Sequence, residues 1–178
     1  MKITTRQLAF NALLAALCAV LGLVSTIDLK IMKITLQSFP VILAGLLFGP
    51  LSGFLVGTVG TFISQALGPY GLMYTTIIWM IPYMVGGFVV GLLAKKKKYH
   101  NTKTEIAVII AIAKVLILIL NTLGMLLDAS IWGYKSYAFA AIGPRCISCI
   151  VEIVIFSIVM MPILKACRRF VSNSHHTN

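Results

Sequence analysis

Apolar residues fill most of this chain and are interrupted by only a few short polar segments. Residues 34–94 include no Asp, Glu, Lys or Arg, and the whole chain has only four acidic residues among 178. Because a helix that crosses a bilayer needs ~20 mainly apolar residues, the charge-free run has room for about three crossings. Breaks at Phe48-Gly49-Pro50 and at residues 67–71 divide this run. The pattern predicts an integral membrane protein.

The other apolar runs bring the prediction to six transmembrane helices. These spans are expected at residues 8–26, 39–47, 51–67, 74–93, 106–125 and 145–164. A loop with Asp128 is expected at residues 126–136. The fold class is therefore all-α, with one six-helix membrane domain at residues 1–170 and a polar cytoplasmic tail at residues 171–178.

The basic residues predict the topology of these spans. The formal net charge is +11, but the charges mostly flank apolar runs and no basic face alternates with aromatic residues, so a nucleic-acid partner is not expected. With six spans both termini lie on one side, together with ten of the fifteen Lys and Arg residues. By the positive-inside rule this side is cytoplasmic. The chain is expected in the cell membrane as a multi-pass protein.

Two predicted spans carry small residues along one face. They are Gly53, Gly57, Gly60 and Ser64 in the third span and Ala12, Ala15, Ala16 and Ala19 in the first. Small residues allow two helix backbones to approach closely in a membrane. The third span is thus predicted to be a packing spine. The alanine face either packs within the chain or docks a partner subunit.

Polar residues inside the spans are candidates for function, because burying them in a bilayer is costly. Arg145 lies in the predicted first turn of the sixth span, where it could bind an anion together with free backbone amides; alternatively it extends to the lipid headgroups. Asn121 is expected at similar depth. Trp79 and Tyr83 share a helix face and form either the wall of a pocket there or an ordinary interfacial belt.

Two opposite charges are expected to meet deeper in the membrane. Glu152 follows Arg145 by seven residues, so it lies on much the same face and ~10 Å deeper. Lys114 is near the middle of the fifth span. We predict a Lys114–Glu152 ion pair, since two unpaired charges at that depth would each be destabilising. Its role is structural or, alternatively, in ligand binding or coupling.

Several motifs are absent from the sequence. There is no Gly-x-x-x-x-Gly-Lys-Ser/Thr loop, no histidine within a predicted span and no carboxylate cluster for metals, so an enzyme is not expected and neither is a cofactor or metal. Cys146-x-x-Cys149 has no second pair nearby, so all four cysteines are interpreted as packing thiols. Secondary transport is only weakly supported, because Glu152 is the only acid expected inside a span and no inverted repeat is evident.

An ordered set of motifs resembles the substrate-binding S-components of energy-coupling factor (ECF) vitamin transporters, closest to the folate branch. The set comprises the Ala-x-x-x-Ala face, residues 39–50 (FPVILAGLLFGP) followed by Gly53 and Val56-Gly57, the basic connector at residues 95–98, Asn121-Thr122 and Pro144-Arg145. The resemblance implies an outward vitamin pocket capped by the loop between spans one and two, with residues 31–37 in the gate. It also implies a transmembrane scaffold subunit that docks on Ala12, Ala16 and Ala19, and two cytoplasmic ATP-binding subunits.

The predicted function is capture of a vitamin or related micronutrient from outside and its delivery with a shared ATPase and scaffold module. The predicted substrate-binding residues are Lys33, Gln37, Tyr70, Trp79, Tyr83, Asn121 and Arg145. Folate is the first choice of ligand, and pantothenate, cobalamin, a B6 vitamer and a queuosine precursor remain open. A standalone secondary carrier or channel for a small organic solute is the alternative, and a non-transporting membrane scaffold is a third.

Overall fold

The computed structural model describes residues 4–24, 27–28, 33–68, 71–96, 102–133 and 142–173. The helices in these ranges are α1 (Thr5–Val24), α2 (Ser38–Phe48), α3 (Pro50–Leu67), α4 (Thr76–Lys96), α5 (Lys103–Trp132) and α7 (Ile142–Asn173). Two short strands, β1 (Ile27–Asp28) and β2 (Lys33–Ile34), pair antiparallel between α1 and α2. The architecture is all-helical apart from this small hairpin.

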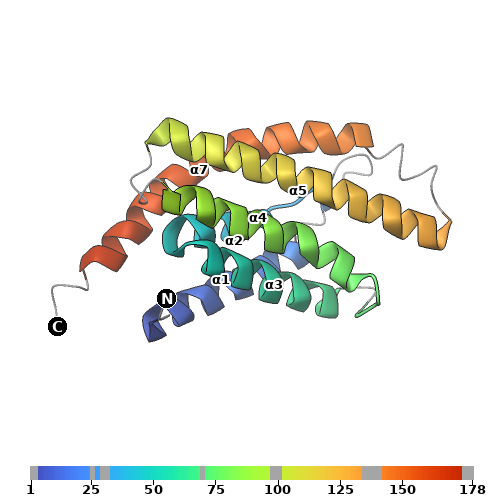
Figure 1. Ribbon diagram of the computed structural model, residues 1–178, viewed down its shortest axis with the longest axis horizontal. Helices are drawn as coiled ribbons and strands as arrows, with labels where there is room; N and C mark the ends of the chain where they lie inside the picture. The colour runs from blue at the N-terminus through green and yellow to red at the C-terminus, as the bar shows by residue number, and fades with distance from the viewer. Residues whose placement is uncertain are drawn as a thin grey trace.

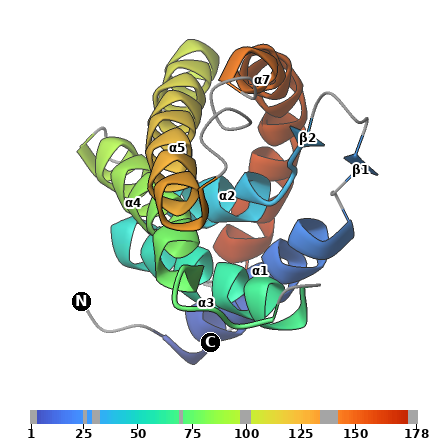
Figure 2. The same ribbon diagram turned by 90° about the vertical axis from the view of Figure 1, so that its right-hand side faces the viewer.

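The long helices run side by side along the long axis of the molecule (Figure 1). Viewed from the end, α5, α7, α1, α3 and α4 surround the short helix α2 (Figure 2). Because α2 is enclosed on all sides, its apolar residues are buried almost completely, among them Val41, Ile42, Ala44 and Leu46. These residues join α1, α4, α5 and α7 in one hydrophobic core. The core therefore positions the start of α2 deep inside the bundle.

The structure supports a multi-pass membrane protein but not six full-length spans. Among the described residues, α1, α3, α4, α5 and α7 are long and apolar enough to cross a membrane, whereas α2 has only 11 residues. At 1.5 Å per residue, such a helix spans about half of a hydrocarbon core of ~30 Å. The prediction of a complete second span in residues 39–47 is thus not confirmed.

The predicted loop at residues 126–136 is wrong over its first half. Helix α5 continues to Trp132, and Asp128 is buried on this helix rather than placed in a loop. No Gly or Pro interrupts residues 125–132, and the helix ends only where Gly133 adopts φ 82° and donates its amide to the Ala129 carbonyl. A positive φ favours glycine, so Gly133 is the actual stop signal.

The other ends of α5 and α7 also lie beyond the predicted spans. A capping box, in which Thr102 and Glu105 satisfy each other's backbone amides, starts α5 at Lys103. Helix α7 passes Leu164 and runs to Asn173, so residues 171–173 of the expected tail are helical. Both helices are therefore longer than a bilayer core requires.

The prediction that the third span is a packing spine is confirmed. All four of its small residues are buried, and Gly53 and Gly57 contact α4 backbone. A Cβ atom added to Gly57 would lie 2.5 Å from the Tyr83 carbonyl oxygen, which no real side chain tolerates. On its other side α3 faces α1, where a Cβ at Gly60 would lie 2.6 Å from the Cys18 Cβ. The glycines thus let α3 pack closely against two helices.

The alanine face of α1 divides into two sides. Ala15 and Ala19 are buried inside the chain, so they pack against its other helices, and docking of a partner through them is untested. They belong to the side of α1 that includes Cys18 and packs on α3. Ala12 and Ala16 are exposed. Docking through these two residues stays a prediction.

Candidate substrate-binding site

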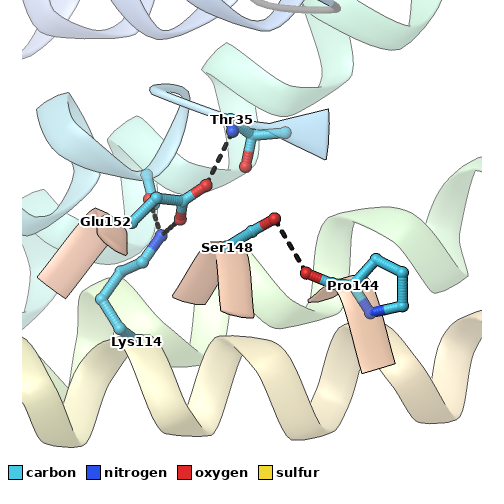
Figure 3. Close-up of polar contacts among 6 residues, drawn as sticks. Thr35, Lys114, Pro144, Ser148 and Glu152 are labelled. Atoms are coloured by element: carbon cyan, nitrogen blue, oxygen red, sulfur yellow. Dashed lines mark hydrogen bonds and ion pairs between the residues drawn. The ribbon is translucent and has the colours of Figure 1, made fainter. Parts of the chain in front are cut away.

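Lys114 and Glu152 form the ion pair that the sequence predicts, between the middle of α5 and α7 (Figure 3). Only 3% of Lys114 and 4% of Glu152 is exposed. Removing both charges from water is costly, and a buried pair is stable only when further hydrogen bonds satisfy the remaining polar atoms. The surroundings of the pair therefore matter as much as the pair itself.

Those further bonds come from the residues that precede and start α2. The second carboxylate oxygen of Glu152, Oε1, accepts the Thr35 backbone amide at 2.7 Å. The Lys114 ammonium donates to the Ser38 hydroxyl at 2.8 Å. The Glu152 carboxylate thus lies beside the N-terminal end of α2, where the helix dipole favours a negative charge. Lys114 and Glu152 therefore each bond the other and also the residues at the start of α2.

We call residues 35–38 the hub segment, because their hydrogen bonds reach α1, α3, α5 and α7. The Cys18 thiol of α1 donates to the Gln37 carbonyl at 3.4 Å, and the Gln37 amide donates to the Thr61 hydroxyl of α3 at 3.4 Å. Tyr83 of α4 is buried and lies near Thr35. Gln37 and Tyr83, both predicted as binding residues, are therefore brought close to the ion pair, and both are buried.

Aromatic rings close the inner side of the pair. The Lys114 ammonium lies 4.8 Å from the centre of the Phe156 ring, one turn beyond Glu152 on α7. Phe39, directly after the hub segment, packs edge-on against Phe156 with ring centres 5.4 Å apart. A cation over an aromatic face is stabilised, and more strongly where water is absent. The polar site is therefore sealed by apolar residues toward the end of the bundle where the chain begins.

Asn121 and Arg145 lie at matching positions on the other side of the ion pair from Phe156. The pair fixes the register of the antiparallel helices α5 and α7, and Asn121 and Arg145 are each seven residues from it, toward the end of α5 and the start of α7. Seven residues are two turns, so both lie ~10 Å from the pair along the helices, on nearly the same faces. Within the described part of the chain, the Asn121 Oδ1 atom is buried and has no hydrogen-bond partner. Nearby, the buried Ser148 hydroxyl donates to the Pro144 carbonyl at 3.0 Å (Figure 3).

The remaining predicted site residues are placed as follows. Trp79 is half-buried and joins an apolar cluster of Met125, Ala129, Leu126 and Ile142, near the start of α4, the end of α5 and the start of α7. Along the helix axes, Trp79 therefore lies closer to Asn121 than to the ion pair. Lys33 is in strand β2, but its side chain is outside the described atoms, and Tyr70 lies outside the described residues.

The sequence analysis missed Cys18, Thr35, Ser38 and Thr61 as members of the site. One available signal was Ser38, a polar residue directly before a long apolar run, which is typical of a helix start. The described residues contain no group of three or more His, Cys, Asp or Glu side chains suited to a metal ion. Among the cysteines, Cys18 and Cys149 are buried, whereas Cys146 is exposed and so is not a packing thiol within this chain.

The fold and the site define a multi-pass membrane protein that encloses charged and hydrogen-bonding groups among its helices. Residues 2–169 match the family described as ECF-type riboflavin transporter, S component, and the chain belongs to this family. It is therefore a membrane-embedded transport component and not an enzyme.

The chain is also similar to individual proteins and to a solved structure. Proteins named UPF0397 from Streptococcus pneumoniae strains Hungary19A-6 and CGSP14 are each 32% identical over 133 residues, which is 74% of this chain and 67% of theirs. The crystal structure of the S-component for biotin from an ECF-type ABC transporter matches with a TM-score of 0.63 at 17% identity, over 90% of this chain and 95% of that one. At this identity the match shows a shared fold.

Proposed function

We propose that this chain captures a vitamin or related micronutrient on the outer side of the membrane and delivers it through an ECF scaffold subunit and two ATP-binding subunits. The observation that carries the proposal is the enclosed polar site, in which a buried ion pair, Asn121 and Arg145 line one stripe between α5 and α7. Polar groups at membrane depth are costly and are retained mainly where they bind or conduct a polar substrate.

The proposed orientation has six crossings and cytoplasmic termini, with the hub segment and α2 together making the second crossing. The beginning of α1 and the end of α7 lie at the same end of the molecule (Figure 1). The lysines at the end of α4 and the start of α5 lie at this end too. This clustering of basic residues supports a cytoplasmic assignment by the positive-inside rule. Asn121, Arg145 and Trp79 then lie toward the outside.

The site favours a ligand that combines an anionic group, a ring and a hydrogen-bond donor. Arg145 is in the first turns of α7, where a carboxylate or phosphate is also attracted by the helix dipole. No group in the described part of the chain bonds the buried Asn121 Oδ1 atom, which is an acceptor that a ligand N–H or O–H group would satisfy. Folate has carboxylates and a ring with N–H donors, so we place it first. Pantothenate, cobalamin, a B6 vitamer and a queuosine precursor follow.

A binding panel with purified protein tests this ligand chemistry. It contains folate, pantothenate, cobalamin, pyridoxal phosphate and a queuosine precursor, together with riboflavin and biotin. For the ligand that binds, N121L should weaken affinity by about tenfold or more, because a donor left unpaired in a buried site costs on the order of 1–3 kcal/mol. N121Q keeps a neutral amide acceptor and should lose less.

Asn11 provides a matched control for this panel. It is also a buried amide whose Oδ1 atom has no partner in the described chain, but it lies near the start of α1 and bonds Ser52 at 3.0 Å. N11L should leave ligand affinity within about twofold of wild type. Equal losses in N11L and N121L would contradict the assignment of Asn121 to the site.

Uptake measurements separate the proposal from the other two functions. Cells that express this chain with a scaffold subunit and two ATP-binding subunits should accumulate labelled ligand, and cells that express the chain alone should not. Accumulation by the chain alone, abolished when the ion gradient is collapsed, would instead identify a secondary carrier. Absence of both binding and uptake in folded protein would favour a non-transporting scaffold.

A further inference from the structure

The contacts of the hub segment differ in strength on its two sides. Toward α5 and α7 it makes two charge-assisted bonds, of 2.7 Å from Thr35 to Glu152 and 2.8 Å from Lys114 to Ser38. Toward α1 and α3 both bonds involve neutral groups at 3.4 Å. Charge-assisted hydrogen bonds are shorter and roughly twice as strong as neutral ones. The charge-assisted bonds of the hub segment are therefore those to the ion pair.

We propose that Lys114 and Glu152 are positioning residues that act as a latch: they hold the hub segment against α5 and α7, and their release opens the bundle interior beneath the candidate site. The further bonds that a buried pair requires come here from the hub segment rather than from α5 or α7. Here each charge makes one bond to its partner and one to the hub segment, so the two sets of bonds form and break together.

The position of the latch links it to the candidate site. Glu152 is on the same face of α7 as Arg145 and Ser148, at spacings of seven and four residues. On the opposite side of the hub segment, the Gln37 carbonyl covers the Cys18 thiol, which is 0% exposed. If the hub segment moved away from Glu152, the face of α7 that includes Arg145 and Ser148 would lose a neighbour, and the Cys18 thiol would become exposed. This inference concerns the fold itself and holds whichever ligand is bound.

Hydrogen exchange of the full-length protein in nanodiscs tests the latch without a ligand. The test variant is K114M/E152M, because removing both charges together avoids leaving one buried and unpaired. We expect exchange in peptides covering residues 33–38 to rise about tenfold, the effect of losing roughly 1.4 kcal/mol, while the melting temperature and exchange in α3 and α4 stay near wild type.

Two further variants make the result specific. S52A removes a buried hydroxyl that accepts bonds from Gln7 and Asn11 at 3.1 and 3.0 Å, far from the hub segment, and should leave exchange at residues 33–38 unchanged. S38A removes only the bond from Lys114 and should raise exchange there in the same direction as the double variant, by a smaller factor. If the double variant does not fold, hydrogen exchange of S38A still tests the proposal.

Native Cys18 supplies an independent readout. With the other cysteines replaced (C146S, C149A, C167S), the rate at which N-ethylmaleimide labels Cys18 should rise about tenfold when the latch is removed. Unchanged exchange at residues 33–38 and unchanged labelling in the latch variants would overturn the proposal. A uniform rise of exchange across all helices would also overturn it, because the pair would then contribute only general stability.

Discussion

The α3–α4 and α5–α7 interfaces are built in opposite ways. At the first, glycine backbones touch: Gly53 contacts Gly87, and Gly57 contacts the Tyr83 carbonyl. At the second, long side chains reach across, and Lys114 and Glu152 make the central contact. A backbone contact has one geometry, whereas side-chain bonds can break and re-form by rotation. Under the proposed latch, the α3–α4 half of the molecule stays fixed and the half with α5 and α7 can rearrange, with the hub segment between them.

The candidate site belongs to the half that can rearrange. Its charged groups are on α5 and α7 and bond the hub segment, while α1 and α3 contribute the neutral Cys18 thiol and Thr61 hydroxyl. Small residues at a helix interface allow close van der Waals packing, which is a main source of helix association in membranes. We therefore expect substitutions in the glycine interface to affect folding, and those in the charged interface to affect both folding and the motion of the hub segment.

The largest effect is expected from G53L. A side chain at residue 53 would collide with the Gly87 backbone, which cannot move aside without separating α3 from α4. We predict that G53L yields no monodisperse protein on size-exclusion chromatography in detergent. G143L is the control, because nothing lies within 4 Å of a Cβ added there. Normal yield and elution of G53L would show that the glycine contact is dispensable.

Removal of one charge should have the next largest effect. K114M leaves Glu152 buried without its cation, and breaking a buried pair in this way costs about 3–5 kcal/mol. The melting temperature in detergent should fall clearly, and K114M/E152M should recover most of the loss. The exposed Lys96 is the control, and K96M should melt like wild type. Equal melting of K114M and wild type would mean that the pair does not stabilise the fold.

Substitutions in the alanine face of α1 should change stability less, and by different amounts at its buried and exposed residues. Ala19 is 3% exposed, so A19L overpacks the fixed half and should destabilise it by about 1–3 kcal/mol. Ala16 is exposed, and A16L should change stability by no more than about 0.5 kcal/mol. Thermal melting of the two variants checks this contrast, which fails if both melt alike.

A16L nevertheless has an expected functional effect. If Ala12 and Ala16 dock the scaffold subunit, a leucine at residue 16 should prevent co-purification with that subunit and block transport, while ligand binding by the isolated chain remains. Affinity capture of the scaffold and the binding panel measure the two properties separately. Loss of both together would contradict docking through this face.

Much of the fold follows from local patterns in the sequence. The apolar runs predicted the helices, and the spacing of Gly53, Gly57, Gly60 and Ser64 predicted a packed face, because in a helix these positions align. The ion pair was predictable because two opposite charges at similar depth have few alternatives. In contrast, the end of α5 was misplaced, since the aromatic and polar residues near 128–132 suggested a loop while the stop signal was Gly133.

The hub segment was not predictable from local patterns. Its bonds to Glu152 and Lys114 join residues more than seventy positions apart in sequence, and its depth depends on the short α2 being enclosed by the long helices. The same reason limits the ligand assignment. Arg145 and Asn121 were singled out because they are polar within apolar runs, but the shape of what they bind depends on how α4, α5 and α7 pack.

The most direct test of the account is mass spectrometry of small molecules released from purified protein. Cells grown with a full vitamin mixture would express wild type, N121L and the control N11L, and each protein would be denatured after purification. We predict a near-stoichiometric micronutrient with a ring and an anionic group in wild type and N11L, and much less of it in N121L. Folded wild-type protein that is reproducibly empty, and that binds nothing in the panel, would contradict the account.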